Sequence, residues 1–325
     1  MRPIRLAIVG ATGLVGRTTL DVLAEWQIPL TSLRLFASTD SSGKMLPFKG
    51  KSLPLEPLDQ IPSDVDAAIF ATSRELSREW IPRFRAAGVL VIDHSSQFRM
   101  EPDVPLVIPE INAPELSQHR GLISNPNCSA SVVLLPLAAV DRAVGLKTVV
   151  VDTYQSVSGS GQDAVTELEA QLEDADRVPR VYPRPIAHNV FPQVGSFDSK
   201  GWCDEERKIV DEIRKILGRR NLQVHTTTVR VPVRIGHSAA VTVECSRPVT
   251  RGEIEAAFQA MLGMIYESSN YRTPREIAGK QEIYVGRLRV NAENPAWLQF
   301  WVVGDNLRKG AASNAVQILM ELFKD

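Results

Sequence analysis

The segment that most constrains the fold of this chain lies near its N-terminus. A short apolar run, Ile4–Val9, leads into a turn that contains three glycines, and a helical pattern of apolar residues follows. Strand, glycine turn and helix in this order begin a dinucleotide-binding fold. Gly10 permits the tight turn, Gly13 lets the backbone approach a pyrophosphate, and Gly16 permits close packing of the helix on the strand. The spacing is a variant of the commoner pattern, so a glycine-rich turn without a ligand is the alternative.

The rest of the first half continues this alternation of strands and helices. Apolar runs predict further strands, and a helical pattern at Arg74–Ala87 separates two of them. The runs are apolar on both faces, as strands of a covered parallel sheet must be, which predicts a doubly wound α/β domain. The further strands are expected at Ser32–Ala37, Ala67–Ala71, Val89–Asp93 and Leu122–Ser124.

The second half has longer strands, some of which alternate apolar with polar residues, as in Ala240–Glu244. This pattern predicts an α+β domain whose mixed or antiparallel sheet has helices on one face. We expect residues 1–126 with 307–325 to form a dinucleotide-binding domain, and residues 127–306 to form a catalytic and dimerisation domain. Strands are expected at Thr148–Val157, Leu222–Val233, Ala239–Cys245, Ile283–Val290 and Trp297–Val303, and helices at Asp204–Leu217, Gly252–Leu262 and Ala311–Phe323.

Composition excludes several classes of function. The net charge is −1 and no basic block stands out, which argues against nucleic-acid and membrane partners. The three cysteines are too few and too scattered for a disulfide framework or a metal site. The longest apolar run, Val132–Val140, is too short to span a bilayer, and the first residues do not resemble a signal sequence. We therefore expect a cytoplasmic protein.

One cysteine stands out by its position. Cys128 follows a Pro-Asn turn and precedes a long apolar segment, where Ser129 and the residues after it suit the first turn of a helix. The positive end of a helix dipole favours a thiolate over a thiol, and a thiolate can attack a carbonyl carbon. The alternative is a small buried cysteine of the core.

Together, these motifs resemble the aspartate-β-semialdehyde dehydrogenase family, in the same order and through nearly the whole chain. The segments that carry the resemblance, besides Ser124–Ser129, are Gly10–Gly13, Asp93–Met100, Val107–Asn112, Tyr154–Gly159, Arg230–Val233 with His237-Ser238, and Val303–Ala312. The resemblance implies an oxidoreductase of amino-acid biosynthesis in the aspartate pathway to lysine, methionine, threonine and isoleucine. Such an enzyme reduces aspartyl phosphate to the semialdehyde with a nicotinamide cofactor, and the reverse reaction consumes phosphate.

The resemblance also assigns the catalytic residues. Cys128 is the nucleophile that forms a thioester, His237 is the acid–base residue, and Gln155 orients the substrate. Without the resemblance, His237 would be an ordinary core or surface histidine, and Gln155 an amide that pairs with the backbone. Because Arg230 and His237 are an odd number apart, a regular strand would point them to opposite faces. We therefore expect the strand to be interrupted between Pro232 and Gly236.

Substrate-binding residues follow by the same resemblance. Arg230 binds the substrate carboxylate, and Arg99, with Asn127 nearby, binds the phosphate. Glu205 meets the substrate amine and Lys208 meets phosphate; the two lie three apart on one helix face. Ordinary alternatives exist for each: a strand-edge salt bridge for Arg230, a solvated loop arginine for Arg99, and a surface ion pair for Glu205 and Lys208.

The cofactor site of the resemblance is the glycine turn, the end of the second strand and positions near the nicotinamide ring. NADP is the family's default, but this chain has Asp40 where NADP-dependent members carry an arginine. An acidic residue there prefers a ribose hydroxyl, so Asp40 weakens NADP preference and favours NAD as an alternative. The expected cofactor-binding residues are Gly10, Thr12, Gly13, Leu14, Val15, Ser38, Thr39, Asp40, Thr72, Ser158, Gly159 and Asn306, and no metal is expected.

Two other readings compete. N-acetyl-γ-glutamyl-phosphate reductase shares the architecture, but its motif has glycine before the cysteine, where this chain has Asn127. An inactive relative acting as a binding protein would have lost the nucleophile or the histidine, and this chain keeps both Cys128 and His237. The resemblance further implies a homodimer formed through the sheet of the second domain, or a homotetramer of such dimers.

Overall fold

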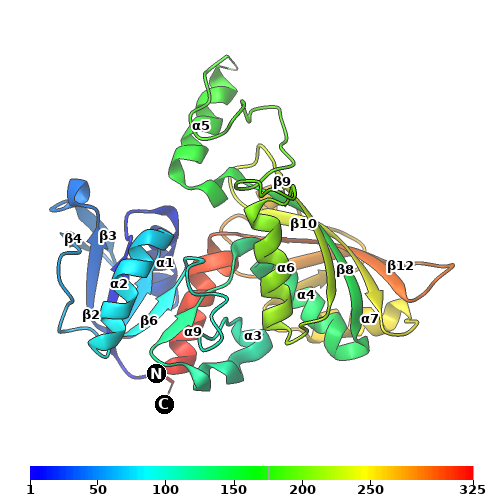
Figure 1. The fold of residues 1–325 in the computed structure, drawn as a ribbon, viewed down its shortest axis with the longest axis horizontal. Helices are drawn as coiled ribbons and strands as arrows, with labels where there is room; N and C mark the ends of the chain where they lie inside the picture. The colour runs from blue at the N-terminus through cyan, green and yellow to red at the C-terminus, as the bar shows by residue number, and fades with distance from the viewer. Residues whose placement is uncertain (175, 325) are drawn as a thin grey trace. The chain divides into compact units, whose positions relative to one another are not determined.

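The chain folds into two compact units. The computed structural model describes residues 1–174 and 176–324. One unit is Met1–Pro126 together with Ala311–Asp325, and the other is Asn127–Gly310 (Figure 1).

The first unit is built on a sheet that, within the described residues, has seven strands in the order β3-β4-β2-β1-β5-β6-β7. All neighbouring strands are parallel except β3 and β4, which form an antiparallel pair. The strands are β1 (Ile4–Val9), β2 (Leu30–Ala37), β3 (Met45–Phe48), β4 (Lys51–Pro57), β5 (Ala67–Phe70), β6 (Leu90–Asp93) and β7 (Leu122–Ser124). The helices are α1 (Leu14–Glu25), α2 (Arg74–Ala86), α3 (Pro109–Asn112) and α9 (Ser313–Leu322).

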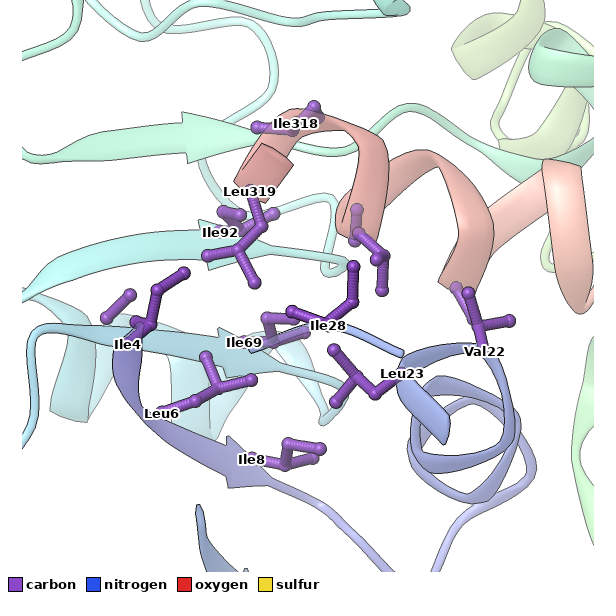
Figure 2. Packing of buried hydrophobic residues seen from close by; sticks show 14 of the residues in the cluster. Ile4, Leu6, Ile8, Val22, Leu23, Ile28, Ile69, Ile92, Ile318 and Leu319 are labelled. Carbon is purple, nitrogen blue, oxygen red and sulfur yellow. The ribbon is translucent and has the colours of Figure 1, made fainter. Parts of the chain in front are cut away.

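Helices cover both faces of this sheet. Alternate residues of β1 point to opposite sides because side chains alternate along a strand. Ile4, Leu6 and Ile8 pack with residues of α1 and α9 (Figure 2), whereas Ala7 and Val9 pack on the other side with α2. The expected doubly wound α/β fold is confirmed.

The glycine turn lies where the strand order reverses. Strand β2 pairs with one edge of β1 and β5 with the other, so the loops after β1 and β5 leave the same end of the sheet. Gly10 has a φ of +85°, and a Cβ there would lie 2.2 Å from the Ala71 carbonyl oxygen. A Cβ on Gly16 would lie 2.2 Å from the Gly10 carbonyl oxygen. Glycine is therefore required at both positions.

The second unit has a mixed sheet, described with six strands in the order β11-β12-β13-β10-β8-β9. Pairs β8–β9 and β11–β12 are parallel and the others are antiparallel. Helices α4, α6 and α7 pack together on the sheet, as the predicted α+β architecture requires. The strands are β8 (Leu146–Gln155), β9 (Gln223–Arg230), β10 (His237–Cys245), β11 (Met264–Glu267), β12 (Ile283–Val290) and β13 (Trp297–Gly304). The helices are α4 (Cys128–Val144), α5 (Gln162–Glu173), α6 (Asp204–Ile216), α7 (Arg251–Ala260) and α8 (Pro274–Ile277).

The described residues form neither a membrane-spanning helix nor a metal-binding cluster. None of the described helices combines the length and the apolar character needed to cross a membrane. No group of three or more histidine, cysteine, aspartate or glutamate side chains within residues 1–174 and 176–324 is arranged to hold a metal ion.

The two-sided core predicts a large difference between two leucines of the first unit. Leu6 is fully buried, whereas Leu76 on α2 is 43% exposed. Leu6→Ala is expected to lower the free energy of unfolding by about 2–5 kcal/mol through the cavity it leaves. Leu76→Ala should change it by less than about 0.5 kcal/mol. Urea denaturation of both variants measures the difference, and equal effects would contradict the packing described for β1.

Candidate active site

The nucleophile candidate begins a helix. Cys128 is the first residue of α4, and Asn127 caps that helix by accepting hydrogen bonds from the backbone N–H groups of Ser129 at 2.8 Å and Ala130 at 3.1 Å. Cys128 is partly exposed, whereas Cys203 and Cys245 are buried. The first turn of α4 itself carries no acidic residue, although two carboxylates of α6, those of Glu205 and Glu212, bind Asn127 at its start. The expected helix start at the cysteine is therefore present.

Three candidate residues lie in one row across three neighbouring strands. Gln155, at the end of β8, pairs with Arg230, at the end of β9. On the other side of β8, Tyr154 pairs with Ser238, which brings His237 beside Gln155. The predicted interruption after Pro232 is present, and it is larger than a bend: Arg230 ends one strand and His237 begins another.

A buried carboxylate joins several of these groups. Glu205 of α6 accepts hydrogen bonds through Oε1 from Asn127 Nδ2 at 2.9 Å and from Gln155 Nε2 at 3.0 Å. Its Oε2 lies 3.6 Å from Lys208 Nζ. Burial by itself raises the pKa of Glu205, but the charge of Lys208 and the hydrogen bonds from Asn127 and Gln155 outweigh it, so the pKa lies below its usual value. This carboxylate is an ionised group inside the unit, and the surface ion-pair alternative does not describe it.

The imidazole of His237 is buried and neutral. Its Nδ1 accepts the backbone N–H of Ser156 at 3.1 Å, and because a backbone N–H can only donate, the proton of the neutral ring lies on Nε2. Burial, assisted by the charge of Arg230, lowers the pKa of His237 to about 3. Nε2 has no hydrogen-bond partner among the described residues. A Cβ on Gly159 would lie 3.1 Å from this nitrogen, so the glycine leaves room beside it.

A serine that sequence reasoning missed supports the histidine. The Ser156 hydroxyl lies 3.1 Å from His237 Nδ1 and can donate to it or accept from it. Because Nδ1 is the acceptor of the Ser156 backbone N–H, the hydroxyl supports the tautomer with the proton on Nε2 by donating to Nδ1. Ser156 lies within the Tyr154–Gly159 motif directly after Gln155, but no feature of the sequence shows that its hydroxyl meets a residue 81 positions away.

Asn306 holds together the segment that contains Ser156 and Ser158 and the turn at Gly236. Its Oδ1 accepts from Gly236 N at 2.8 Å and from the Ser156 hydroxyl at 3.1 Å, and its Nδ2 donates to the Ser158 hydroxyl at 3.0 Å. Ser158, Gly159 and Asn306, expected near the nicotinamide ring, therefore lie together in the second unit around His237.

Arg230 is held by the backbone and by an aromatic ring. Its Nη1 donates to the Ser156 carbonyl oxygen, and the guanidinium lies 5.9 Å from the centroid of the Tyr182 ring. Within the described part of the chain no carboxylate forms an ion pair with it, and its buried Nε has no partner there. The guanidinium is therefore available to an anionic ligand, and the strand-edge salt bridge is not present.

Arg99 belongs to the first unit. It is buried, and its Nε and Nη2 donate to the carbonyl oxygens of Asn125 at 2.9 Å and His94 at 2.6 Å. The loop arginine is thus fixed in place, unlike the solvated alternative. Asn127, expected near it, lies in the second unit with Glu205 and Gln155.

The remaining expected cofactor residues also lie in the first unit. Gly13 is the N-cap of α1, with no side chain capping the helix and no acidic residue in its first turn. The backbone N–H groups there are open to an anion, as binding of a pyrophosphate requires. Asp40 is exposed in a short 3₁₀ turn, Thr39–Ser41, that follows β2. The other positions, all partly or fully exposed, are Thr12, Leu14, Val15, Ser38 and Thr72.

Two histidines, the buried His237 and the partly buried His94 with its covered Nε2, predict acid sensitivity. Burial, assisted by Arg99, lowers the pKa of His94 to about 3, as for His237. In the unfolded chain, both imidazoles become protonated as the pH falls below their usual pKa of 6.5. In the folded chain, they become protonated only near pH 3. The free energy of unfolding should therefore decrease as the pH is lowered from about 6.5 toward about 3, by up to about 1.4 kcal/mol per pH unit for each histidine.

Urea denaturation across this range tests the acid sensitivity. His94→Gln should make the pH dependence shallower, and His188→Asn, at an exposed position, should leave it unchanged. A folded His94→Gln protein with the original dependence would contradict the assignment.

The chain is similar to known proteins over nearly its whole length. Residues 5–119 match the family model described as semialdehyde dehydrogenase, NAD binding domain, and residues 134–309 match the model of the semialdehyde dehydrogenase dimerisation domain. An aspartate-semialdehyde dehydrogenase of Aquifex aeolicus is 40% identical, over 99% of this chain and 98% of that protein. One from Rickettsia bellii is 38% identical, over 98% of this chain and 97% of that protein.

The fold is also similar to that of a solved structure. The crystal structure of aspartate semialdehyde dehydrogenase II from Vibrio cholerae complexed with ASA has a TM-score of 0.97 and 38% identity, and the match covers 100% of this chain and 99% of that one. From the two family models in order and relatives matched over nearly their full length, we conclude that this chain belongs to the aspartate-semialdehyde dehydrogenase family of NAD(P)-dependent oxidoreductases.

Proposed function

We propose that this chain reduces L-4-aspartyl phosphate to L-aspartate 4-semialdehyde with release of phosphate. The observation that carries the proposal is the placement of Cys128 at the start of α4, beside the cap residue Asn127 that Glu205 holds. The Vibrio cholerae relative, whose structure is described as a complex with ASA, supports the choice of substrate.

Cys128 performs the covalent step. Its thiolate attacks the acyl carbon, a C–S bond forms, and the carbonyl oxygen becomes an oxyanion. The backbone N–H groups at the start of α4 and the Nε2–H of His237 are the donors for this oxyanion. When the C–O bond to phosphate breaks, phosphate leaves with the electron pair and a thioester remains on Cys128.

A nicotinamide cofactor, when bound at the glycine turn of the first unit, supplies the hydride that reduces the thioester. His237 again donates through Nε2–H to the developing oxyanion. The C–S bond then breaks, its electron pair returns to Cys128 as thiolate, and the aldehyde leaves. Accepting a proton at Nε2 would require the other tautomer, which the Ser156 backbone N–H disfavours because a protonated Nδ1 cannot accept from it.

The remaining residues bind the substrate. Arg230, with its unpartnered Nε, holds the substrate carboxylate, and Glu205 holds the amine. Lys208 is the phosphate-binding residue of the second unit and Arg99 that of the first, and Gln155 orients the acyl group beside Glu205.

Assembly and location follow from the same proposal. The chain forms a homodimer, or a homotetramer of dimers, through the sheet face of the second unit that carries the partly exposed side chains of Val150, Tyr154 and Trp301. A catalytic thiolate is best preserved in a reducing compartment, which favours the cytoplasm.

Turnover tests the substrate assignment. Oxidation of aspartate semialdehyde should require phosphate and a nicotinamide cofactor, and Cys128→Ala should lower kcat by about 10³-fold or more because the covalent route is lost. Cys245→Ala, far from every site motif, serves as the control. Activity with N-acetylglutamate semialdehyde but not with aspartate semialdehyde would favour the alternative reductase, and no turnover with either would contradict the proposal.

Asp40 predicts the cofactor preference. We propose that NADP is used, with NAD accepted because the Asp40 carboxylate disfavours a 2′-phosphate. Asp40→Arg should raise the ratio of kcat/KM for NADP to that for NAD by about 10- to 100-fold, the value of one charge-assisted hydrogen bond. Asp59→Arg, an exposed site with the same charge change, is the control. A strong NADP preference in the unmodified protein would show that Asp40 points away from the cofactor.

A further inference from the structure

A second buried glutamate contacts the helix start that carries the nucleophile. Glu212 is 1% exposed, and its Oε2 accepts the backbone N–H of Asn127 at 2.6 Å. Glu205, Lys208 and Glu212 are spaced by three and four residues, so they lie on one face of α6. Helices α4 and α6 contact each other (Figure 1), and this face meets the start of α4.

The bond from Glu212 replaces an acceptor that α4 lacks. In a capping box, a glutamate or glutamine three residues after the cap accepts the backbone N–H of the cap residue. That position in α4 is Ala130, which has no acceptor in its side chain. The same N–H is bound here by a carboxylate 85 residues along the chain. The helix cap is thus completed from another helix.

The two glutamates bind opposite ends of the cap residue. Glu205 accepts from the side-chain Nδ2 of Asn127, while Glu212 accepts from its backbone N–H. The Oδ1 of Asn127 remains free to cap the N–H groups of Ser129 and Ala130. The peptide that leads into Cys128 is therefore fixed from two directions.

We propose that Glu212 is a positioning residue that fixes the start of α4 and thereby aims the Cys128 thiolate and the N–H groups around it. The inference concerns the nucleophile and deepens the proposed function, on which its kinetic part rests. Glu212 acts through Asn127 and does not itself contact the reacting atoms.

Alkylation of Cys128 by iodoacetamide tests the positioning directly. Cys203 and Cys245 are fully buried, and burial raises the pKa of Cys245 to about 11, so the reaction reports on Cys128. Glu212→Leu removes the acceptor, so alkylation near pH 7 should be slower, and its pH profile should lie higher, than in Glu212→Gln, which loses the same negative charge but keeps an acceptor for the cap. Its kcat should fall by about 10- to 100-fold, as for a misplaced catalytic group.

Glu212→Gln separates hydrogen bonding from charge. The amide keeps a carbonyl oxygen for the Asn127 N–H but carries no charge, so this variant should stay within about threefold of the unmodified protein in both assays. Asp211→Leu, on the exposed side of the same helix, is the control. Equal impairment of the Gln and Leu variants, or normal alkylation in a folded Leu variant, would overturn the proposal.

The alkylation assay also keeps the two proposals distinguishable. It uses no substrate, so it decides the role of Glu212 even if the unmodified protein does not oxidise aspartate semialdehyde. Absence of turnover in the unmodified protein would contradict the proposed function alone.

Discussion

The hydrogen bonding of Asn127 is the constraint on which the rest of the site depends. Asn127 is the first residue of the second unit and the N-cap of α4, so its conformation determines where that helix begins. A helix that began one residue later would rotate its first side chain by about 100°. The two carboxylates of α6 that bind Asn127 therefore determine the direction of Cys128 as well as the stability of the cap.

Burial of these two carboxylates in the second unit costs free energy. Glu205 and Glu212 are both buried close to the start of α4, and a buried charge is costly unless hydrogen bonds compensate it. Asn127 provides part of that compensation for each of them, through different groups. The neutral state of His237 fits this balance, since the positive Arg230 already lies nearby and burial disfavours a second cation. The hydrogen bonds of Asn127 therefore join Glu205, a proposed substrate-binding residue, to the structural cap of α4.

Much of the fold could be predicted from the sequence because buried strands and helices have characteristic patterns of apolar residues. The continuous apolar runs at β1, β5 and β6 predicted a sheet covered on both faces. The glycine turn after β1 predicted the end of that sheet at which a cofactor binds. The β3–β4 pair was not predicted, because Pro47, Pro54 and Pro57 interrupt both segments. Proline is tolerated there because Pro47 lies in the edge strand β3, Pro54 lies outside the residues of β4 that pair with β2, and Pro57 is the last residue of β4.

The site was less readable, since its contacts join distant parts of the chain. The motif order identified Cys128, Gln155 and His237, and the odd spacing from Arg230 predicted the interruption. This spacing did not predict that the two resulting strands, β9 and β10, pair with opposite sides of β8. Ser156 and Glu212 were missed because their roles consist of single contacts, 81 and 85 residues away, that leave no local pattern.

The row formed by Arg230, Gln155 and His237 has a consequence for how such a sequence can change. The three side chains share one row only while β8 keeps its register with both neighbours. Insertion or deletion of one residue within β8 would shift that register and turn Gln155 toward the opposite face. The connection at 231–236 lies outside the strands, so its length is less restricted. Length variation among related chains should therefore collect in loops and avoid β8, even though most of its residues never touch a substrate.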